Sequence, residues 1–128
     1  MTTVLLFHHV LGCTEGIHHM AAQNLAMNRK GGRGALFISS CAPPSAFGTS
    51  WPSELPVQIH GMDQDVFFAE EGDLEEAQEI VAASEHGELF VYKGDQHFFA
   101  DDSLPGYDAS AADLLLQRIL AFLSRLDS

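Results

Sequence analysis

Two stretches decide the fold expected for this sequence: Val57–Phe68, which reads VQIHGMDQDVFF, and Leu89–Asp102, which reads LFVYKGDQHFFADD. Each begins with a short run of mostly apolar residues and continues into a polar segment that contains glycine. Such runs are typical of strands, and the polar segment marks the loop that follows. Asp65 lies after the first predicted strand and His97 after the second.

The rest of the chain alternates between strand-like and helix-like patterns. Strands are predicted at Thr3–His8, Ala35–Ser39, Val57–His60 and Leu89–Tyr92, and helices at His18–Asn28, Asp73–Ser84 and Ala109–Leu126. Cys41–Pro56 is rich in Pro, Ser and Gly and is predicted to be a long loop. Asp73 and Glu76 resemble a capping pair for the second helix, and Asp108 or Ser110 can cap the third. This alternation favours an α/β fold with a parallel sheet.

Composition and charge narrow the class of protein. The chain has 128 residues, of which 46% are apolar, and this length predicts one domain spanning 1–128. The formal charge of −12 disfavours nucleic acid and anionic membranes as partners. Apolar runs are all shorter than a membrane helix requires, and we expect a cytoplasmic protein. The two cysteines form neither a disulfide framework nor a four-cysteine zinc pattern.

The predicted functional residues follow the strands, because ligands bind beyond the carboxyl ends of parallel strands. The loop after Thr3–His8 contains Cys13 and Thr14, and Asp65 and His97 follow later strands. Nucleophile, acid and histidine in this chain order match the catalytic triad of α/β-hydrolases. A thiol or hydroxyl is a weak nucleophile until a histidine takes its proton, and a carboxylate holds that histidine in the required tautomer.

The two opening stretches, together with Ser103–Leu126 (SLPGYDASAADLLLQRILAFLSRL) and Phe7–Gly16 (FHHVLGCTEG), resemble the dienelactone hydrolase family. The resemblance implies an α/β-hydrolase fold and hydrolysis of a small ester, lactone or thioester, with no cofactor. It matches Asp65 to the triad acid and His97 to the triad histidine. His9 falls where the family often has a polar partner of the nucleophile.

The chain departs from the family pattern at the nucleophile. Family members are longer and have a separate strand, elbow and helix of the G-x-C-x-G or G-x-S-x-G type. Here the predicted strand Thr3–His8 enters the helix directly through Gly12, Cys13, Thr14, Glu15 and Gly16. We therefore expect a reduced parallel sheet of about four strands. Cys13 is the preferred nucleophile and Thr14 the alternative, with backbone N–H groups of this turn as oxyanion donors.

The sequence also allows a different function. The chain can instead be a catalytically silent relative that serves as a small-ligand-binding or oligomeric assembly module. The apolar Thr3–His8 strand at a sheet edge predicts a homodimer or higher oligomer. Adjacent histidines on a strand point to opposite faces, so His8 and His9 do not easily bind one ion. Zinc sites on a helix prefer imidazoles at i and i+4, so we expect no metal site at the second pair, His18 and His19.

Two further features are predicted to be structural. Cys41, in a Ser-Cys-Ala-Pro-Pro loop, is expected to pack rather than to react. The basic segment 29–33 (RKGGR) ends a helix, where positive charge complements the helix dipole, and its glycines follow the helix instead of preceding it. The segment is therefore not predicted to be a phosphate-binding loop.

Overall fold

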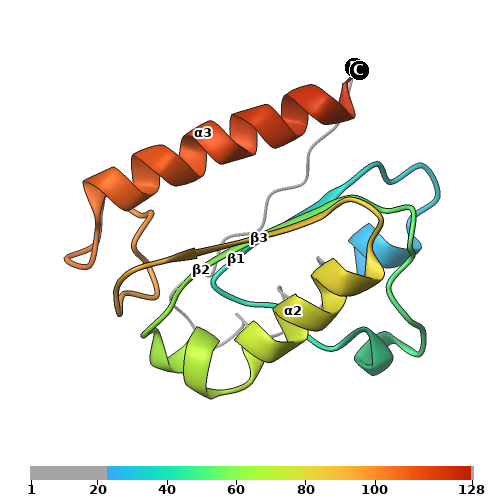
Figure 1. Ribbon diagram of the computed structural model, residues 1–128, viewed down its shortest axis with the longest axis horizontal. Helices are drawn as coiled ribbons and strands as arrows, with labels where there is room; N and C mark the ends of the chain where they lie inside the picture. The colour runs from blue at the N-terminus through green and yellow to red at the C-terminus, as the bar shows by residue number, and fades with distance from the viewer. Residues whose placement is uncertain (1–22, 128) are drawn as a thin grey trace.

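The computed structural model describes residues 23–127 and consists of a small parallel sheet with helices on both faces (Figure 1). Residues 23–28 are helical. The elements that follow are β1 (Ala35–Ile38), the 3-10 turn η1 (Pro44–Phe47), β2 (Val57–Met62), the π-helical turn η2 (Val66–Glu70), α2 (Asp73–Ala83), β3 (Gly87–Tyr92) and α3 (Ala109–Leu126). The predicted Thr3–His8 strand, the Gly12–Gly16 turn and residues 18–22 of the predicted His18–Asn28 helix lie outside the described residues.

The sheet has the order β1-β2-β3, and both neighbouring pairs are parallel. Val57 in the central strand pairs with Ala35 of β1 and Gly87 of β3, so the three strands begin at one edge. Their carboxyl ends consequently meet at the other edge. The predicted α/β class with a reduced parallel sheet is confirmed for this part of the chain.

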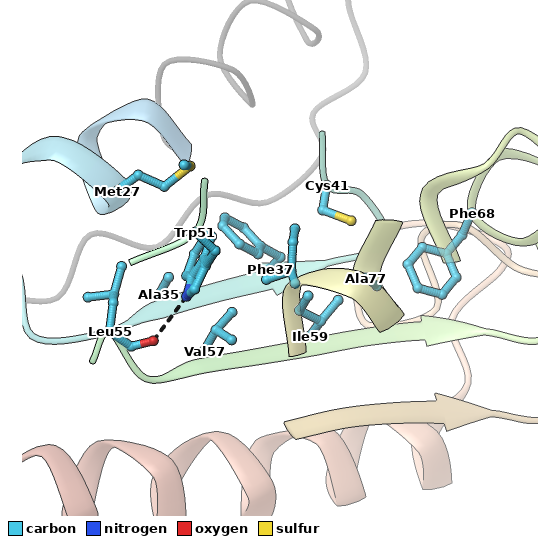
Figure 2. Close-up of a cluster of buried hydrophobic side chains, with 11 residues drawn as sticks. Met27, Ala35, Phe37, Cys41, Trp51, Leu55, Val57, Ile59, Phe68 and Ala77 are labelled. Carbon is cyan, nitrogen blue, oxygen red and sulfur yellow. Dashed lines mark hydrogen bonds between the residues drawn. The ribbon is translucent and has the colours of Figure 1, made fainter. Parts of the chain in front are cut away.

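Alternate residues of each strand build two separate cores. Ala35 and Phe37 face α2 and the helical residues 23–28, where they pack with Val57, Ile59 and Trp51 (Figure 2). The intervening residues of β1, Leu36 and Ile38, face α3 and pack with other apolar side chains, which are Met62, Tyr92, Phe99, Leu115 and Ile119. Successive strand side chains point to opposite faces, so a strand covered on both sides must be continuously apolar. This explains why β1 is buried at every position.

The helix starts differ in part from the sequence predictions. The predicted cap of α3 is confirmed, because the Asp108 carboxylate accepts a hydrogen bond from the Ala111 N–H at 3.1 Å. The predicted capping pair of α2 is wrong. The N-cap residue is Gly72, at φ 100°, and its position has no side-chain hydrogen bond. The Asp73 carboxylate turns instead toward the backbone N–H of Cys41, 3.4 Å away.

The π-helical turn η2 was not predicted. It follows Asp65 directly and places Phe68 in the core beside Gly61 of β2. A single π turn has no sequence periodicity of its own, and such turns are frequent at functional sites. Among residues 23–127, no helix has the length and apolar character needed to cross a lipid bilayer.

Candidate functional site

Asp65 and His97 form a buried pair at the carboxyl edge of the sheet. The Asp65 Oδ2 atom lies 2.6 Å from His97 Nδ1, and the two residues are 1% and 9% exposed. The other carboxylate oxygen, Oδ1, accepts the backbone N–H of Phe67 at 3.0 Å. With Nδ1–H donating to the carboxylate, the imidazole is held in the tautomer whose Nε2 atom carries the lone pair. This is the orientation that a general base requires.

The two loops that carry this pair are tied together beyond the ends of the strands. The Asp63 N–H donates to the Tyr92 carbonyl at 2.9 Å, and the Gln64 N–H donates to the Gly94 carbonyl at 2.8 Å. The Asp63 carboxylate accepts the Gly94 N–H at 3.0 Å. The β2–β3 ladder therefore continues into both loops, and this fixes Asp65 and His97 relative to each other.

The carboxyl end of β1 also contributes to the site, through a hydrogen bond from Ser39 to the backbone of His97. Ser39 follows β1, is 1% exposed, and donates its hydroxyl proton to the His97 carbonyl at 2.9 Å. Its backbone is in the left-handed region at φ 63°, a conformation that non-glycine residues adopt at a cost of roughly 1–3 kcal/mol. Such strain is found where surrounding contacts enforce it, often beside functional residues. The sequence predicted Ser39 as the last residue of a strand and not as a support for His97.

Two aromatic rings flank the imidazole. Phe67 and Phe98 each meet His97 edge to face, with centroid distances of 5.2 and 5.0 Å. Phe67 is 52% exposed and its neighbour Val66 is 50% exposed, although both are large apolar side chains. An apolar surface thus borders the histidine. The sequence alone does not reveal this surface, because Phe67 and Phe68 are adjacent and only the π turn directs one side chain outward and the other into the core.

Cys41 lies in the core on the α2 side of the sheet (Figure 2). Its thiol donates to the Asp73 carbonyl at 3.2 Å. Burial raises the thiol pKa well above its ordinary range, and the nearby carboxylates of Asp73 and Glu76 raise it further. A thiol that stays protonated is not nucleophilic. The packing role predicted for Cys41 agrees with this environment.

His60 is hydrogen-bonded through both of its ring nitrogens. It is fully buried on β2, with Nδ1 2.8 Å from the Tyr92 hydroxyl and Nε2 2.7 Å from the Gln58 side-chain oxygen. Burial lowers its pKa to about 3, and the nearby Arg118 guanidinium contributes to the same shift. His60 is therefore a neutral core residue. In the part of the chain that the structure describes, no group of His, Cys, Asp or Glu side chains is arranged to hold a metal ion.

The remaining predicted site residues lie outside the described residues. They are His9, Gly12, Cys13, Thr14 and Glu15. The structure thus brings together the predicted acid and histidine and adds Ser39 and Phe67 to their surroundings. Which residue serves as nucleophile stays a prediction.

Comparison with known proteins places these residues in a family. The model of the dienelactone hydrolase family matches residues 41–126, a region that includes Asp65, His97 and the whole of α3. No curated protein and no solved structure matches the chain. The matched region covers well over half of the 128 residues. On this match, and with an acid–histidine pair held at the ends of two parallel strands, the chain belongs to the dienelactone hydrolase family.

Proposed function

We propose that this protein hydrolyses a small ester, lactone or thioester, with Cys13 as nucleophile, His97 as general base and acid, and Asp65 as the residue that orients His97. The observation that carries the proposal is the buried Asp65–His97 hydrogen bond of 2.6 Å at the carboxyl edge of the sheet. Membership of a hydrolase family supports the same reaction class.

The reaction follows acyl-transfer chemistry. His97 Nε2 takes the thiol proton of Cys13, and the sulfur attacks the carbonyl carbon to give a tetrahedral oxyanion. His97 returns the proton to the leaving oxygen or sulfur as the bond to the carbonyl carbon breaks. Water, deprotonated by the same nitrogen, then attacks the acyl carbon. The bond from that carbon to the Cys13 sulfur breaks, His97 returns the proton to the sulfur, and the acid is released. Backbone N–H groups of the Gly12–Gly16 turn would stabilise the oxyanion in both steps.

The unpaired side of β1 is consistent with a nucleophile that comes from the amino-terminal segment. β1 pairs with β2 on one side, and within residues 23–127 no strand pairs with its other side. A parallel strand at Thr3–His8, connected through a helix to β1, would lie beside β1 by the usual right-handed crossover. Its following turn would then reach the same edge as Ser39 and His97. Cys13 and Thr14 are the candidate nucleophiles of that turn, Glu15 accompanies them, and His9 is the proposed polar partner.

The surroundings of the pair favour an uncharged substrate with an apolar group. Phe67 and Val66 provide an exposed apolar surface next to the imidazole. Acidic side chains dominate the loops after β2 and β3, namely Asp63, Glu70, Glu71, Asp95, Asp101 and Asp102. Their negative field disfavours anionic substrates.

The test is covalent labelling with an activated acyl ester at neutral pH, followed by intact mass spectrometry and peptide mapping. We expect an adduct on Cys13, and His97→Ala should slow its formation by roughly 10²–10⁴-fold, the usual contribution of a general base. His86→Ala is the matched control, because His86 is an exposed histidine at the amino end of β3. Asp65→Asn should slow labelling in the same direction as His97→Ala.

The alternative outcomes are distinct. An adduct on Thr14 keeps the hydrolase and changes the nucleophile. Absence of an adduct, or labelling that is equal in His97→Ala and wild type, contradicts the hydrolase proposal. The chain would then be a silent relative that acts as a small-ligand-binding or assembly module.

A further inference from the structure

A cavity lies at the opposite edge of the sheet from the Asp65–His97 pair. Its volume is about 410 Å³, and its lining includes Gly32 and Arg33, which precede β1, and Pro56, which precedes β2. Arg125 and Leu126 close it from the end of α3. A strand of six residues such as β2 spans about 20 Å, so the length of the sheet separates this cavity from the catalytic pair. Figure 1 shows α3 running back over the sheet from one edge to the other.

Three arginines line this cavity in a strongly acidic protein. The whole chain has six Lys and Arg against 18 Asp and Glu, and half of those cations, Arg29, Arg33 and Arg125, surround one opening. Arg29 and Arg33 are near in sequence, but Arg125 comes from the far end of the chain, so only the fold gathers them. Like charges repel one another, and an anion between them would relieve that cost.

Two of the three guanidinium groups, those of Arg29 and Arg33, keep donors available for a ligand. Arg33 donates to the Leu126 carbonyl, which is one acceptor for a group that has five N–H donors. Arg125 pairs with Glu88 at an exposed position. Within residues 23–127, the Arg29 side chain makes no hydrogen bond or ion pair with another residue. The planar guanidinium group of arginine presents its N–H donors as a fork, and this fork matches the geometry of carboxylate and phosphate oxygens.

The floor of the cavity is apolar and its size is limited. The buried side chains of Met27 and Leu55 contribute to the lining. A volume of about 410 Å³ falls at the small end of ligand sites, which run from roughly 300 to 1,000 Å³. One acid, Glu54, also lines the cavity, so the formal charge of the lining is positive but not extreme. These properties fit a small molecule with an oxyanion at one end and an apolar body at the other.

We propose that the cavity bounded by Arg29, Arg33 and Arg125 binds a small organic oxyanion, a carboxylate or phosphate monoester that carries an apolar group. The oxyanion contacts the arginines, and the apolar group lies over Met27 and Leu55. This site is independent of the proposed hydrolase activity, because it uses none of the residues at the carboxyl edge.

The test is titration of the ¹⁵N-labelled protein with benzoate and with phenyl phosphate, followed by backbone amide chemical shifts. Both probes should perturb the amides of residues 26–33, 54–55 and 125–126 (the prolines give no amide signal), and the effect should weaken as salt is added. Arg29→Gln should weaken binding about tenfold, as expected for loss of one charge-assisted hydrogen bond. Arg29→Lys keeps the charge without the fork and should give an intermediate affinity.

Two controls make the proposal falsifiable. Lys93→Gln removes the same unit of charge at the end of β3, away from the cavity, and should leave affinity unchanged. Benzyl alcohol has the apolar body without the oxyanion and should not bind. The proposal is overturned if neither anion shifts these amides, if benzyl alcohol shifts them equally, or if Lys93→Gln weakens binding as much as Arg29→Gln. Arg29 is exposed, so its substitution is not expected to disturb folding.

Discussion

The two cysteines of this protein are expected to differ in reactivity, because their side chains have different environments. Cys41 is 7% exposed and belongs to the α2-side core, together with Phe37, Trp51 and Ala77. Its raised pKa, caused first by burial and then by nearby carboxylates, keeps it protonated at neutral pH. Cys13, in contrast, is proposed to be a nucleophile at a helix amino terminus, where a thiolate is favoured. The two thiols are thus expected to react very differently.

We predict that a thiol reagent modifies one cysteine of the native protein at neutral pH and that this cysteine is Cys13. Cys13→Ser should react with no more than trace reagent until urea unfolds the chain and exposes Cys41. Cys41→Ala serves as the matched variant and should keep the native reaction. Rapid modification of Cys41 in the folded Cys13→Ser protein would contradict the burial argument.

At the scale of elements, β2 and η2 pack closely where Gly61 of β2 meets the ring of Phe68 on η2. A Cβ at Gly61 would collide with the ring of Phe68, which is fully buried on η2. Because the ring is enclosed by the core, it cannot move aside without a shift of the turn. The turn begins at Asp65, so the position of the Asp65 carboxylate depends on a glycine in the strand that precedes it.

Gly61→Ala is therefore expected to destabilise the protein by about 1–3 kcal/mol, the usual range for overpacking a core. It should also lower the rate of acylation more than the loss of folded protein explains, since the turn that carries Asp65 must move. Urea unfolding together with the labelling rate measures both effects. Gly48→Ala is the control without a steric clash, because nothing lies within 4 Å of a Cβ at that position. Its backbone is left-handed at φ 76°, so this variant should lose some stability while its folded fraction keeps the wild-type labelling rate. Unchanged stability in Gly61→Ala would show that η2 adjusts freely.

A second feature at this scale is the polar network between the sheet and α3. His60 links Gln58 and Tyr92, and the Gln58 amide also donates to the Arg118 carbonyl of α3 at 3.2 Å. The Arg118 guanidinium lies over the Phe90 ring, 4.1 Å from its centroid. His60 and both of its hydrogen-bond partners are buried, so the site tolerates no added charge on the imidazole.

We predict that His60 makes the protein acid-sensitive. Its pKa is about 3 when folded against an ordinary value of 6.5, so below pH 6.5 the unfolded chain binds a proton that the folded chain excludes. Its contribution to stability is complete above pH 6.5 and is lost as the pH falls toward 3, with a slope of about 1.4 kcal/mol per pH unit. Urea unfolding of wild type and His60→Gln across this range should give a shallower dependence for the variant. Parallel curves would contradict the prediction.

On the scale of the whole molecule, charge and exposed apolar surface act against each other. The net charge of −12 keeps copies apart. The outer side of α3, however, exposes Leu116 and Leu120 by 53% and 57%, and the apolar segment Thr3–His8 was expected to form a sheet edge. Apolar edges and faces of this kind promote association between copies.

We predict a homodimer or higher oligomer whose association strengthens with salt, because salt screens the repulsion between acidic copies. Size-exclusion chromatography with light scattering at micromolar concentration measures the mass at low and high ionic strength. Leu5→Lys should shift the population toward monomer if the Thr3–His8 edge makes the contact, and Leu120→Lys should do so if α3 makes it. A monomeric wild type under all these conditions would refute the prediction.

The sequence by itself determined the order of the strands and helices β1, β2, α2, β3 and α3, but not the short turns η1 and η2. Continuous apolar runs at Ala35–Ile38 and Val57–His60 and the 3.6-residue period of Ala109–Leu126 depend on local burial patterns, which a chain displays directly. It also placed Asp65 and His97 after neighbouring strands, and parallel pairing then required their loops to share one edge. Their positions in the chain were thus enough to predict that they would meet.

Only the tertiary structure decided what surrounds the Asp65–His97 pair and how the cavity lined by arginines forms. The left-handed backbone of Ser39, the outward turn of Phe67 and the meeting of Arg125 with Arg29 are set by contacts between residues far apart in the chain. A local pattern carries no record of such contacts, because they arise when strands and helices pack and the side chains adjust to fill the remaining space. The physical reason is that periodicity reports which face of an element is buried, whereas packing decides what it is buried against.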